Sequence, residues 1–412
     1  MHARGVAIPD APFPCDGVAM TVDSPSTQRE APALPQTLRL GAVDLTVADL
    51  DRAVAWYQSA LGLRVHRHEA DVAELGDGVE TVVVLHEDAQ ARPAGRHAGL
   101  YHYALLYPSR EELARAAVRL AATRTPIEGA SDHRTHEAIY LPDADGNGIE
   151  LAADRPHEEW PTDLGYQHGP APLDFDSLLA TVAGEERRDH IGEGLRMGHL
   201  HLHVGDIGQG LAFYRDVLGF EVKANLGSAA FVSAGGYHHH LGFNVWRGRG
   251  VGAPPAHTVG LRHWTVQLPT DADVAEVRAR AEAAGVEVEP ADGGFLVRDP
   301  WRAAVAIVST EATGLRSQAV VATEKPSPYL LQVAKHFRHK LDVRFDEREA
   351  VVPFTAGHAD LRAGEHALTI TAFAQTPADL GRVERVIGSH LERFGKRDEL
   401  AVRFEPQSPA HR

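Results

Sequence analysis

An internal repeat restricts the fold of this chain more than any other feature. Residues 41–65 align without gaps with residues 198–222 at an offset of 157 positions, so that Asp49 matches Asp206. Self-similarity over this length indicates duplication of a structural unit. In each copy, alternating apolar residues predict a strand, the Asp predicts the N-cap of a helix, and a Gly predicts where that helix ends.

The duplicated segment is only part of a longer pattern. Three further strands follow each copy, and a second strand–helix–strand–strand–strand unit follows those. In the first half this second unit comprises residues 100–122, a strand and a helix, and residues 136–154, a hairpin around a Gly-Asn turn. Residues 261–288 and 294–309 repeat the plan in the second half. The sequence therefore predicts an α+β fold with four βαβββ units in two domains.

The remaining segments are predicted from composition and periodicity. The four units fill residues 37–155 and 196–310, and residues 156–195 between them are expected to form a polar linker with one short helical patch. Residues 1–36 are rich in Pro, Ser and Thr without a period, which predicts a disordered tail. Residues 311–412 match neither repeat, and their helical and alternating patterns predict a third, α+β domain.

Composition narrows the classes of partner. The chain of 412 residues carries a formal net charge of −16, which disfavours nucleic acid and anionic membranes as partners. Its one cysteine, Cys15, excludes an intrachain disulfide and favours a cytoplasmic location. We find neither an apolar run long enough to span a bilayer nor the pattern of a secretory signal. These features favour an enzyme with a small or neutral substrate.

Several motifs together resemble a known superfamily. They are "AWYQSALGL" and "AFYRDVLGF" in the repeated helices, "LYHYALLYPSR", the "DADGNGIEL" hairpin and "GYHHHLGFN". The chain is similar to the vicinal oxygen chelate superfamily, and its two repeated domains resemble the catechol-2,3-dioxygenase branch of type I extradiol dioxygenases. The resemblance implies glyoxalase/bleomycin-resistance/extradiol-dioxygenase-type domains. The C-terminal hundred residues resemble a small bacterial family of unknown function, which implies no chemistry.

The resemblance implies a divalent metal held between paired units. Ligands in the family occupy one place on the first strand of a unit and one on the last strand after the Gly-Asn turn. In the second unit these places hold His102 and Glu150, and in the third unit the first-strand place holds His199. The first unit has Ala42 there, which cannot bind a metal.

The fourth unit decides which units should face each other. It has His263 at the first-strand place but Ala306 where the carboxylate belongs, so pairing the third and fourth units leaves no carboxylate. Only His102, Glu150 and His199 make the two-His, one-carboxylate set of non-haem Fe(II) oxygenases. We therefore expect the second and third units to face each other, in one chain or across a dimer.

Further residues match the catalytic accessories of the family. His239, within the run His238–His240, aligns with the acid/base histidine, and Tyr140 aligns with a substrate-binding tyrosine. His133 lies near the second active-site histidine, with a spacing that differs by two residues. If the run is a strand, alternation places His239 on one face and its two neighbours on the other.

The resemblance implies an Fe(II) enzyme, with Mn(II) as the alternative metal, that cleaves catechol-type diols with O₂ and forms a homo-oligomer. One other hypothesis is a protein that sequesters an aromatic small molecule, with or without a metal. Another is a glyoxalase-type isomerase or lyase, which would need carboxylates from both units of its site. Iron content and oxygen uptake on adding catechol distinguish these three hypotheses.

Overall fold

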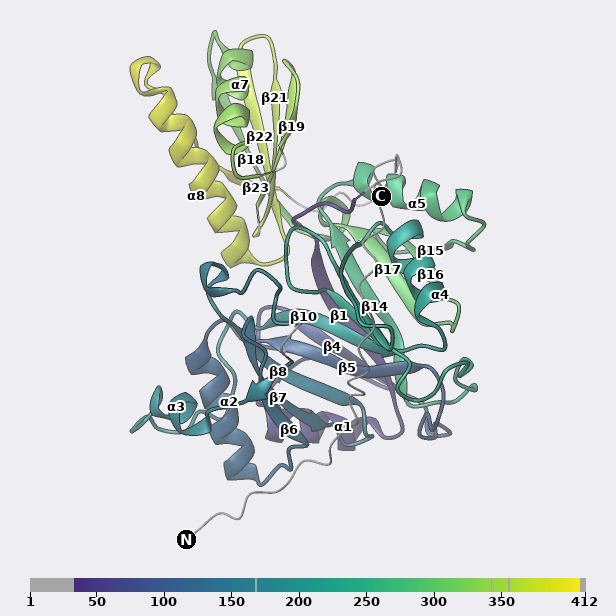
Figure 1. Ribbon diagram of the computed structural model, residues 1–412. Helices are drawn as coiled ribbons and strands as arrows, with labels where there is room; N and C mark the ends of the chain where they lie inside the picture. The colour runs from purple at the N-terminus through teal and green to yellow at the C-terminus, as the bar shows by residue number, and fades with distance from the viewer. Residues whose placement is uncertain (1–32, 167–168, 342, 355, 408–412) are drawn as a thin grey trace.

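The computed structural model describes residues 33–166, 169–341, 343–354 and 356–407 (Figure 1). It contains the four predicted βαβββ units in sequence. The first unit contains β1 (Arg39–Val47), α1 (Leu50–Trp56), β2 (Arg64–Glu69), β3 (Val72–Gly76) and β4 (Thr81–Glu87), and the second contains β5 (Gly99–Leu106), α2 (Arg110–Thr123), β6 (Gly129–Asp132), β7 (His136–Pro142) and β8 (Gly148–Asp154). The third unit contains β10 (Arg196–His203), α4 (Ile207–Leu211), β11 (Glu221–Asn225), β12 (Ala229–Ser233) and β13 (Leu241–Asn244). The fourth unit contains β14 (Gly260–Leu268), α5 (Asp271–Ala283), β15 (Glu289–Ala291), β16 (Gly294–Arg298) and β17 (Ala304–Ser309).

Every unit has the same strand order. The first strand pairs in parallel with the fourth, as β1 does with β4 and β5 with β8, and the other two strands follow in antiparallel order. The third and fourth units repeat this order. Because a parallel pair needs a crossover connection, the helix of each unit connects its first strand to the other three.

The units exchange partners between the two repeats. β5 of the second unit pairs antiparallel with β10 of the third, and β1 of the first unit pairs antiparallel with β14 of the fourth. Strands β1–β17 are thus connected in one sheet, in which the pair of Leu40 on β1 with Met197 on β10 joins two eight-stranded halves, each made of one unit from either repeat (Figure 1). The second and third units face each other within a single chain, as the distribution of candidate ligands predicted.

The predicted helix starts are confirmed. The side chain of Asp49 accepts a hydrogen bond from the backbone N–H of Arg52, and that of Asp206 accepts one from Gln209. Both helices continue as a turn of π-helix, over Tyr57–Leu61 and Ala212–Val217. Side-chain capping at the N-terminus satisfies donors that the helix itself leaves unpaired.

The repeated tyrosine fixes the turn that precedes the last strand of the neighbouring unit. Tyr57 is fully buried, and its hydroxyl lies 2.8 Å from that of Tyr103 and 2.9 Å from Oδ2 of Asp143. Asp143 Oδ1 accepts backbone N–H groups of Asp145 and Asn147, which closes the turn between β7 and β8. The "DADGNG" segment is thus a hydrogen-bonded turn.

We expect Tyr57→Phe to lower the free energy of unfolding by about 1–3 kcal/mol, because it leaves two buried polar partners with a hydrogen bond missing. Tyr214→Phe is the matched variant, since the hydroxyl of Tyr214 has one partner, Asp299 Oδ2 at 2.9 Å. Urea unfolding of both variants measures the difference. An unchanged midpoint in Tyr57→Phe would mean that this hydroxyl network does not support the turn.

The linker contains the short helix predicted there, α3, together with two further short elements, and the end of the predicted tail is ordered. The segment 156–195 contains a 3₁₀ turn (His157–Glu159), β9 (Ala171–Pro172) and α3 (Phe175–Ala180). The tail predicted over residues 1–36 lies outside the described residues up to residue 32. Beyond that point Leu34 is buried, and its N–H donates to the carbonyl of Gly219 at 3.0 Å.

The C-terminal domain has its own sheet and core, and in Figure 1 it stands to one side of the four units. Its six-stranded sheet has the order β19-β20-β21-β22-β18-β23, and α7 and α8 pack against it. The elements are α6 (Thr310–Thr313), β18 (Leu315–Ala322), α7 (Pro326–Phe337), β19 (Arg344–Phe345), β20 (Glu349–Phe354), β21 (Gly357–Ala363), β22 (Ala367–Ala374), α8 (Pro377–Phe394), a 3₁₀ turn (Lys396–Asp398) and β23 (Glu405–Gln407). Among the described residues, no helix has both the length and the apolar character that crossing a membrane requires.

Candidate metal centre

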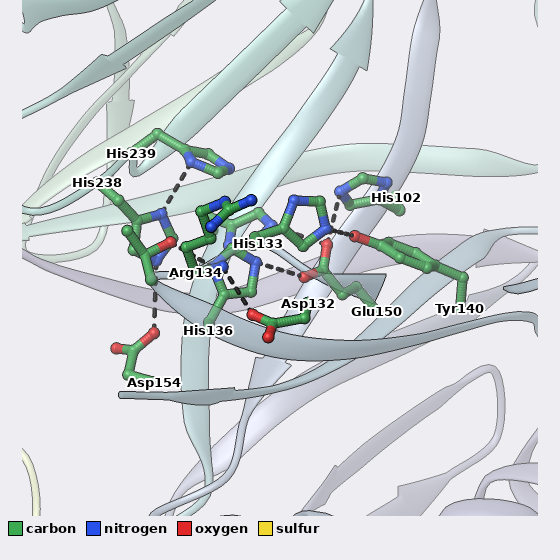
Figure 2. A network of polar contacts seen from close by, with 12 residues as sticks. His102, Asp132, His133, Arg134, His136, Tyr140, Glu150, Asp154, His238 and His239 are labelled. Atoms are coloured by element: carbon green, nitrogen blue, oxygen red, sulfur yellow. Dashed lines mark hydrogen bonds and ion pairs between the residues drawn. The ribbon is translucent and has the colours of Figure 1, made fainter. Parts of the chain in front are cut away.

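The pairing of β5 with β10 brings together the three residues predicted as metal ligands. Nε2 of His102 and Nε2 of His199 lie 3.1 and 3.0 Å from the same oxygen, Oε2 of Glu150. The two imidazole centroids are 5.7 Å apart, as ligands of one ion require. All three side chains are buried, and Figure 2 shows His102 and Glu150 side by side.

Strand register explains why these side chains meet. Ala104 on β5 lies directly opposite Glu150 on β8 and opposite His199 on β10. Directly paired residues project from the same face of a sheet, as do residues two apart on one strand, so His102 shares that face. The small Ala104 side chain leaves space between the two larger neighbours. His102, Glu150 and His199 therefore surround Ala104 on one face of the sheet.

β8 lies close to β5 at its first residue, Gly148. Gly148 lies opposite His102, and a Cβ atom there would come within 2.1 Å of the carbonyl oxygen of Tyr101. A side chain at this position would push β8 away from β5. Glycine after the Gly-Asn turn thus keeps Glu150 within reach of the histidines.

The three imidazoles around Glu150 determine its charge. Burial by itself raises the pKa of this carboxyl, but His199 and hydrogen bonds with His102 and His136 outweigh it and hold the pKa well below the usual value. Burial lowers the pKa of His199. The centre therefore favours an ionised Glu150 beside a neutral His199, which are the protonation states of metal ligands.

His136 is a member of this cluster that the sequence analysis missed. Its Nε2 lies 3.1 Å from the other oxygen of the carboxylate, Oε1 of Glu150, and its Nδ1 lies 2.9 Å from Oγ1 of Thr135. Period-two alternation could have found it, because His136 lies four residues before Tyr140 on β7 and thus shares its face. It is flanked by stacked rings of His133 and His238, each at a centroid distance of 4.6 Å.

The histidine run is not a strand, so the prediction that it alternates between two faces was wrong. β13 begins only at Leu241, and the run lies in a bend after Gly235 and Gly236, whose φ values are 63° and 78°. Positive φ favours glycine and turns the chain sharply. His238 and His239 consequently both reach the cluster (Figure 2).

His239 lies against one of the candidate ligands. Its ring centroid is 4.2 Å from that of His199, and its Nδ1 lies 2.9 Å from Nδ1 of His238. Burial and the neighbouring imidazoles hold its pKa well below the usual value. The third member of the run, His240, contacts Oγ of Ser233 at 2.9 Å through Nδ1.

The linker and β8 contribute residues that the sequence did not suggest. Oδ1 of Asp154 lies 3.4 Å from Nε2 of His238, and the hydroxyl of Tyr237 donates to Oδ2 of Asp154 at 3.0 Å. Tyr166 of the linker donates to the carbonyl of His238 at 2.9 Å. Its hydroxyl also lies 3.3 Å from Nδ1 of His239. These contacts fix both imidazoles in place.

The two remaining predicted residues form a pair of their own. Nε2 of His133 lies 2.7 Å from the hydroxyl of Tyr140, and the Tyr140 ring is 5.6 Å from that of His102 (Figure 2). Burial lowers the pKa of His133 to about 3 and raises that of Tyr140 well above 10. A neutral imidazole and a neutral phenol thus lie beside the candidate ligands.

Exposed aromatic rings lie next to this cluster. Tyr101 and Trp246 are 41% and 53% exposed, and their rings are 5.6 Å apart. Tyr101 also contacts His102 at a centroid distance of 4.9 Å, and Trp246 contacts His201 at 5.4 Å. Exposed aromatic side chains beside a buried polar cluster provide a surface that suits a flat aromatic ligand.

The other half of the molecule holds the histidine that the alternative pairing would use. His263 lies on β14 with its Nε2 3.1 Å from Oδ2 of Asp44, and Oδ1 of Asp44 lies 2.7 Å from Nε2 of His86. Ala306 occupies the place that corresponds to Glu150, two residues beyond the partner of His263. His263 is therefore separated from the buried cluster of the second and third units.

Comparison with known proteins identifies the family. The model of the glyoxalase/bleomycin resistance protein/dioxygenase superfamily matches residues 39–151 and 196–305. The chain belongs to this superfamily. A catechol-2,3-dioxygenase from Bacillus subtilis (strain 168) is 39% identical over 275 residues, which are 65% of this chain and 96% of that protein. Residues 318–405 match a family described as an uncharacterized protein conserved in bacteria (DUF2218).

Solved structures resemble the repeated part of the chain. Glyoxalase I from Zea mays is 15% identical with a TM-score of 0.43, and the match covers 66% of this chain and 92% of that one. The cppA protein from Streptococcus pneumoniae is also 15% identical with a TM-score of 0.43, and the match covers 66% and 98% of the two chains.

The buried residues fit a divalent transition metal. Within the described residues, four overlapping groups of three in this cluster have ligand atoms within 4.8 Å of one another. The group of His102, Glu150 and His199 offers two imidazoles and one carboxylate, which is the donor set of Fe(II) sites that keep positions open. Without a cation, one buried carboxylate is the shared neighbour of three imidazoles.

Proposed function

We propose that this protein is a non-haem Fe(II) extradiol dioxygenase that cleaves the ring of catechol-type diols with O₂. The observation that carries the proposal is the buried set of His102, Glu150 and His199 around Ala104. The 39% identity with a catechol-2,3-dioxygenase over nearly the whole of that relative supports the same reaction class. Mn(II) prefers similar donors and is the alternative metal.

His102, Glu150 and His199 would hold the ion, and other side chains fix the histidine rings around them. Two neutral imidazoles and one ionised carboxylate would hold Fe(II), and Asp154 and Thr135 fix neighbouring rings from outside. Such partners orient ligands and increase their affinity for the metal. When bound, Fe(II) supplies a Lewis acid that acidifies the diol and a partner for dioxygen.

His239 is placed to handle a proton. Its hydrogen-bonding contacts with His238 and Tyr166 use Nδ1, which leaves Nε2 for a substrate hydroxyl. Burial and the neighbouring imidazoles hold the pKa of His239 well below the usual value, so its imidazole is neutral before the reaction and can accept a proton from the substrate. Tyr140 and His133 would orient the second hydroxyl, because their neutral side chains hydrogen-bond each other beside His102.

The donor set argues against the glyoxalase-type alternative. That chemistry would need a carboxylate from each unit of the site, whereas the third unit supplies His199 and the second alone supplies Glu150. A sequestering protein would need no acid/base group. The buried histidines around the three candidate ligands are more than binding alone requires.

Anaerobic purification followed by addition of catechol tests the proposal. We expect bound iron and stoichiometric oxygen uptake, with a yellow ring-cleavage product that forms at the rate of uptake. The matched control is the same protein treated with an iron chelator, which should bind catechol weakly and consume no oxygen. Binding of catechol by the iron-loaded protein without oxygen uptake would favour sequestration and contradict the proposal.

A further inference from the structure

A second cluster of potential ligands lies where the fourth unit meets the C-terminal domain. Glu311 comes from α6, directly after the last strand of the fourth unit, and His358 and Asp360 come from β21. His358 Nε2 lies 3.8 Å from Oε1 of Glu311 and 3.8 Å from Oδ1 of Asp360. His358 and Asp360 are two apart on one strand and project from the same face.

His358 is the residue that requires an explanation. Its side chain is 0% exposed, and neither of its ring nitrogens has a hydrogen-bond partner among the described residues. Oδ1 of Asp360 is likewise unpaired. A distance of 3.8 Å is too long for a hydrogen bond. Burying such groups without partners is unfavourable, so native structures almost always satisfy them.

The two distances from His358 Nε2 are those that a shared metal ion produces, and the three ligand atoms all lie within 4.8 Å of one another. Ligand atoms about 2.0–2.2 Å from one ion, at angles between tetrahedral and trigonal, lie about 3.3–3.8 Å apart. Stacking on Phe373, at a centroid distance of 4.5 Å and an interplanar angle of 9°, holds the His358 ring in position. The backbone N–H of Asp271 donates to Oε2 of Glu311 at 2.8 Å and leaves Oε1 directed at His358.

Electrostatics also favour a cation here. Burial raises the pKa of Asp360 to about 6; His358 opposes this shift and Glu311 adds to it. Two carboxylates facing one buried imidazole form an unfavourable site while it holds no positive charge. Beside His358 lies a cavity of about 10 Å³, about the space that one water molecule needs. A water molecule in this cavity would be a further ligand of the metal.

We propose that Glu311, His358 and Asp360 bind a divalent transition metal of the Zn²⁺ class, which clamps the C-terminal domain onto the fourth unit. One imidazole with two carboxylates suits Zn²⁺ better than Ca²⁺ or Mg²⁺, which prefer six or more oxygen ligands. The ion pair of Arg344 with Asp273 on α5 already joins the C-terminal domain to the fourth unit, and that of Asp379 with Arg39 on β1 joins it to the first unit. The clamp is independent of the proposed dioxygenase activity.

Metal content and thermal stability of the full chain test the proposal. We would use the double variant His136→Ala/His199→Ala, which removes a member of each of the four ligand groups in the first cluster, as the background, and add Zn²⁺ alone after chelation. We expect one zinc per chain and a rise in Tm on the order of 5–10 °C, because a ligand that binds only the folded state stabilises it. Replacing Zn²⁺ with Co²⁺ should give the absorption bands of a four-coordinate site.

Glu311→Gln and Asp360→Asn in that background should each lose the zinc and the rise in Tm. Both are nearly isosteric, so if one fails to fold the other still tests the site. Glu365→Gln, at an exposed carboxylate of the same domain, is the matched control and should keep both. Equal zinc content in all three variants, or no zinc in the background protein, would overturn the proposal. So would a rise in Tm that is the same with and without added zinc.

Discussion

His199→Ala is expected to remove the bound iron and to abolish ring cleavage, the largest effect that we predict. The side chain is one of two imidazoles that share Oε2 of Glu150, and of the three assigned ligands it is the one that the third unit supplies. Mutating a residue that hydrogen-bonds to a metal ligand typically lowers metal affinity or activity about 10–100-fold. Removing a ligand itself should lower both by more. Iron content and oxygen uptake with catechol measure both losses.

His263→Ala is the matched control for this variant. It replaces the histidine at the same place of the fourth unit, but that histidine pairs with Asp44 in the other eight-stranded half. We expect it to keep most of the iron and most of the turnover. If His263→Ala lost the iron while His199→Ala kept it, the third and fourth units would hold the metal and our assignment would be wrong.

The pairing of units could be predicted because ligand chemistry is residue-specific. The resemblance supplied the ligand places, and because Ala42 and Ala306 cannot bind a metal, only one combination of these places gave the two-His, one-carboxylate set. The repeat predicted the succession of strands and helix along each unit, since each copy carries the same apolar alternation and the same Asp cap. The structure pairs β5 with β10 within one chain, which sequence could not distinguish from pairing across a dimer.

The other residues of the site could not be placed from the sequence, because their positions depend on backbone conformation that periodicity in the sequence does not determine. Alternation was applied to His238–His240 as if the run were a strand, although two glycines with positive φ precede it and turn the chain. His136 was missed for the opposite reason, because alternation along β7 was not followed back from Tyr140. Tyr166 could not be predicted as a neighbour of His239, because no periodicity in the sequence relates this linker residue to the histidine run.

The bent conformation also changes what the histidine run predicts for mutants. On a strand, His238 would face away from the site and tolerate substitution. In the structure it is 2% exposed and lies between Asp154 and His239, so it is a poor control. His240 is the better one, because its Nδ1 contacts Oγ of Ser233 rather than the candidate ligands.

His239→Phe is expected to keep the iron and the ability to bind catechol, because the three candidate ligands are unchanged. Turnover should fall on the order of 10²–10⁴-fold, the usual contribution of a positioned proton-transfer group. The residual rate should rise with pH, since prior ionisation of catechol partly replaces a missing base. His240→Gln should stay near the wild-type rate at every pH. Stopped-flow turnover of both variants between about pH 6 and 9 measures the contrast. Full activity in His239→Phe, or an equal loss in His240→Gln, would mean that another group moves the proton, and His238 would be the next to examine.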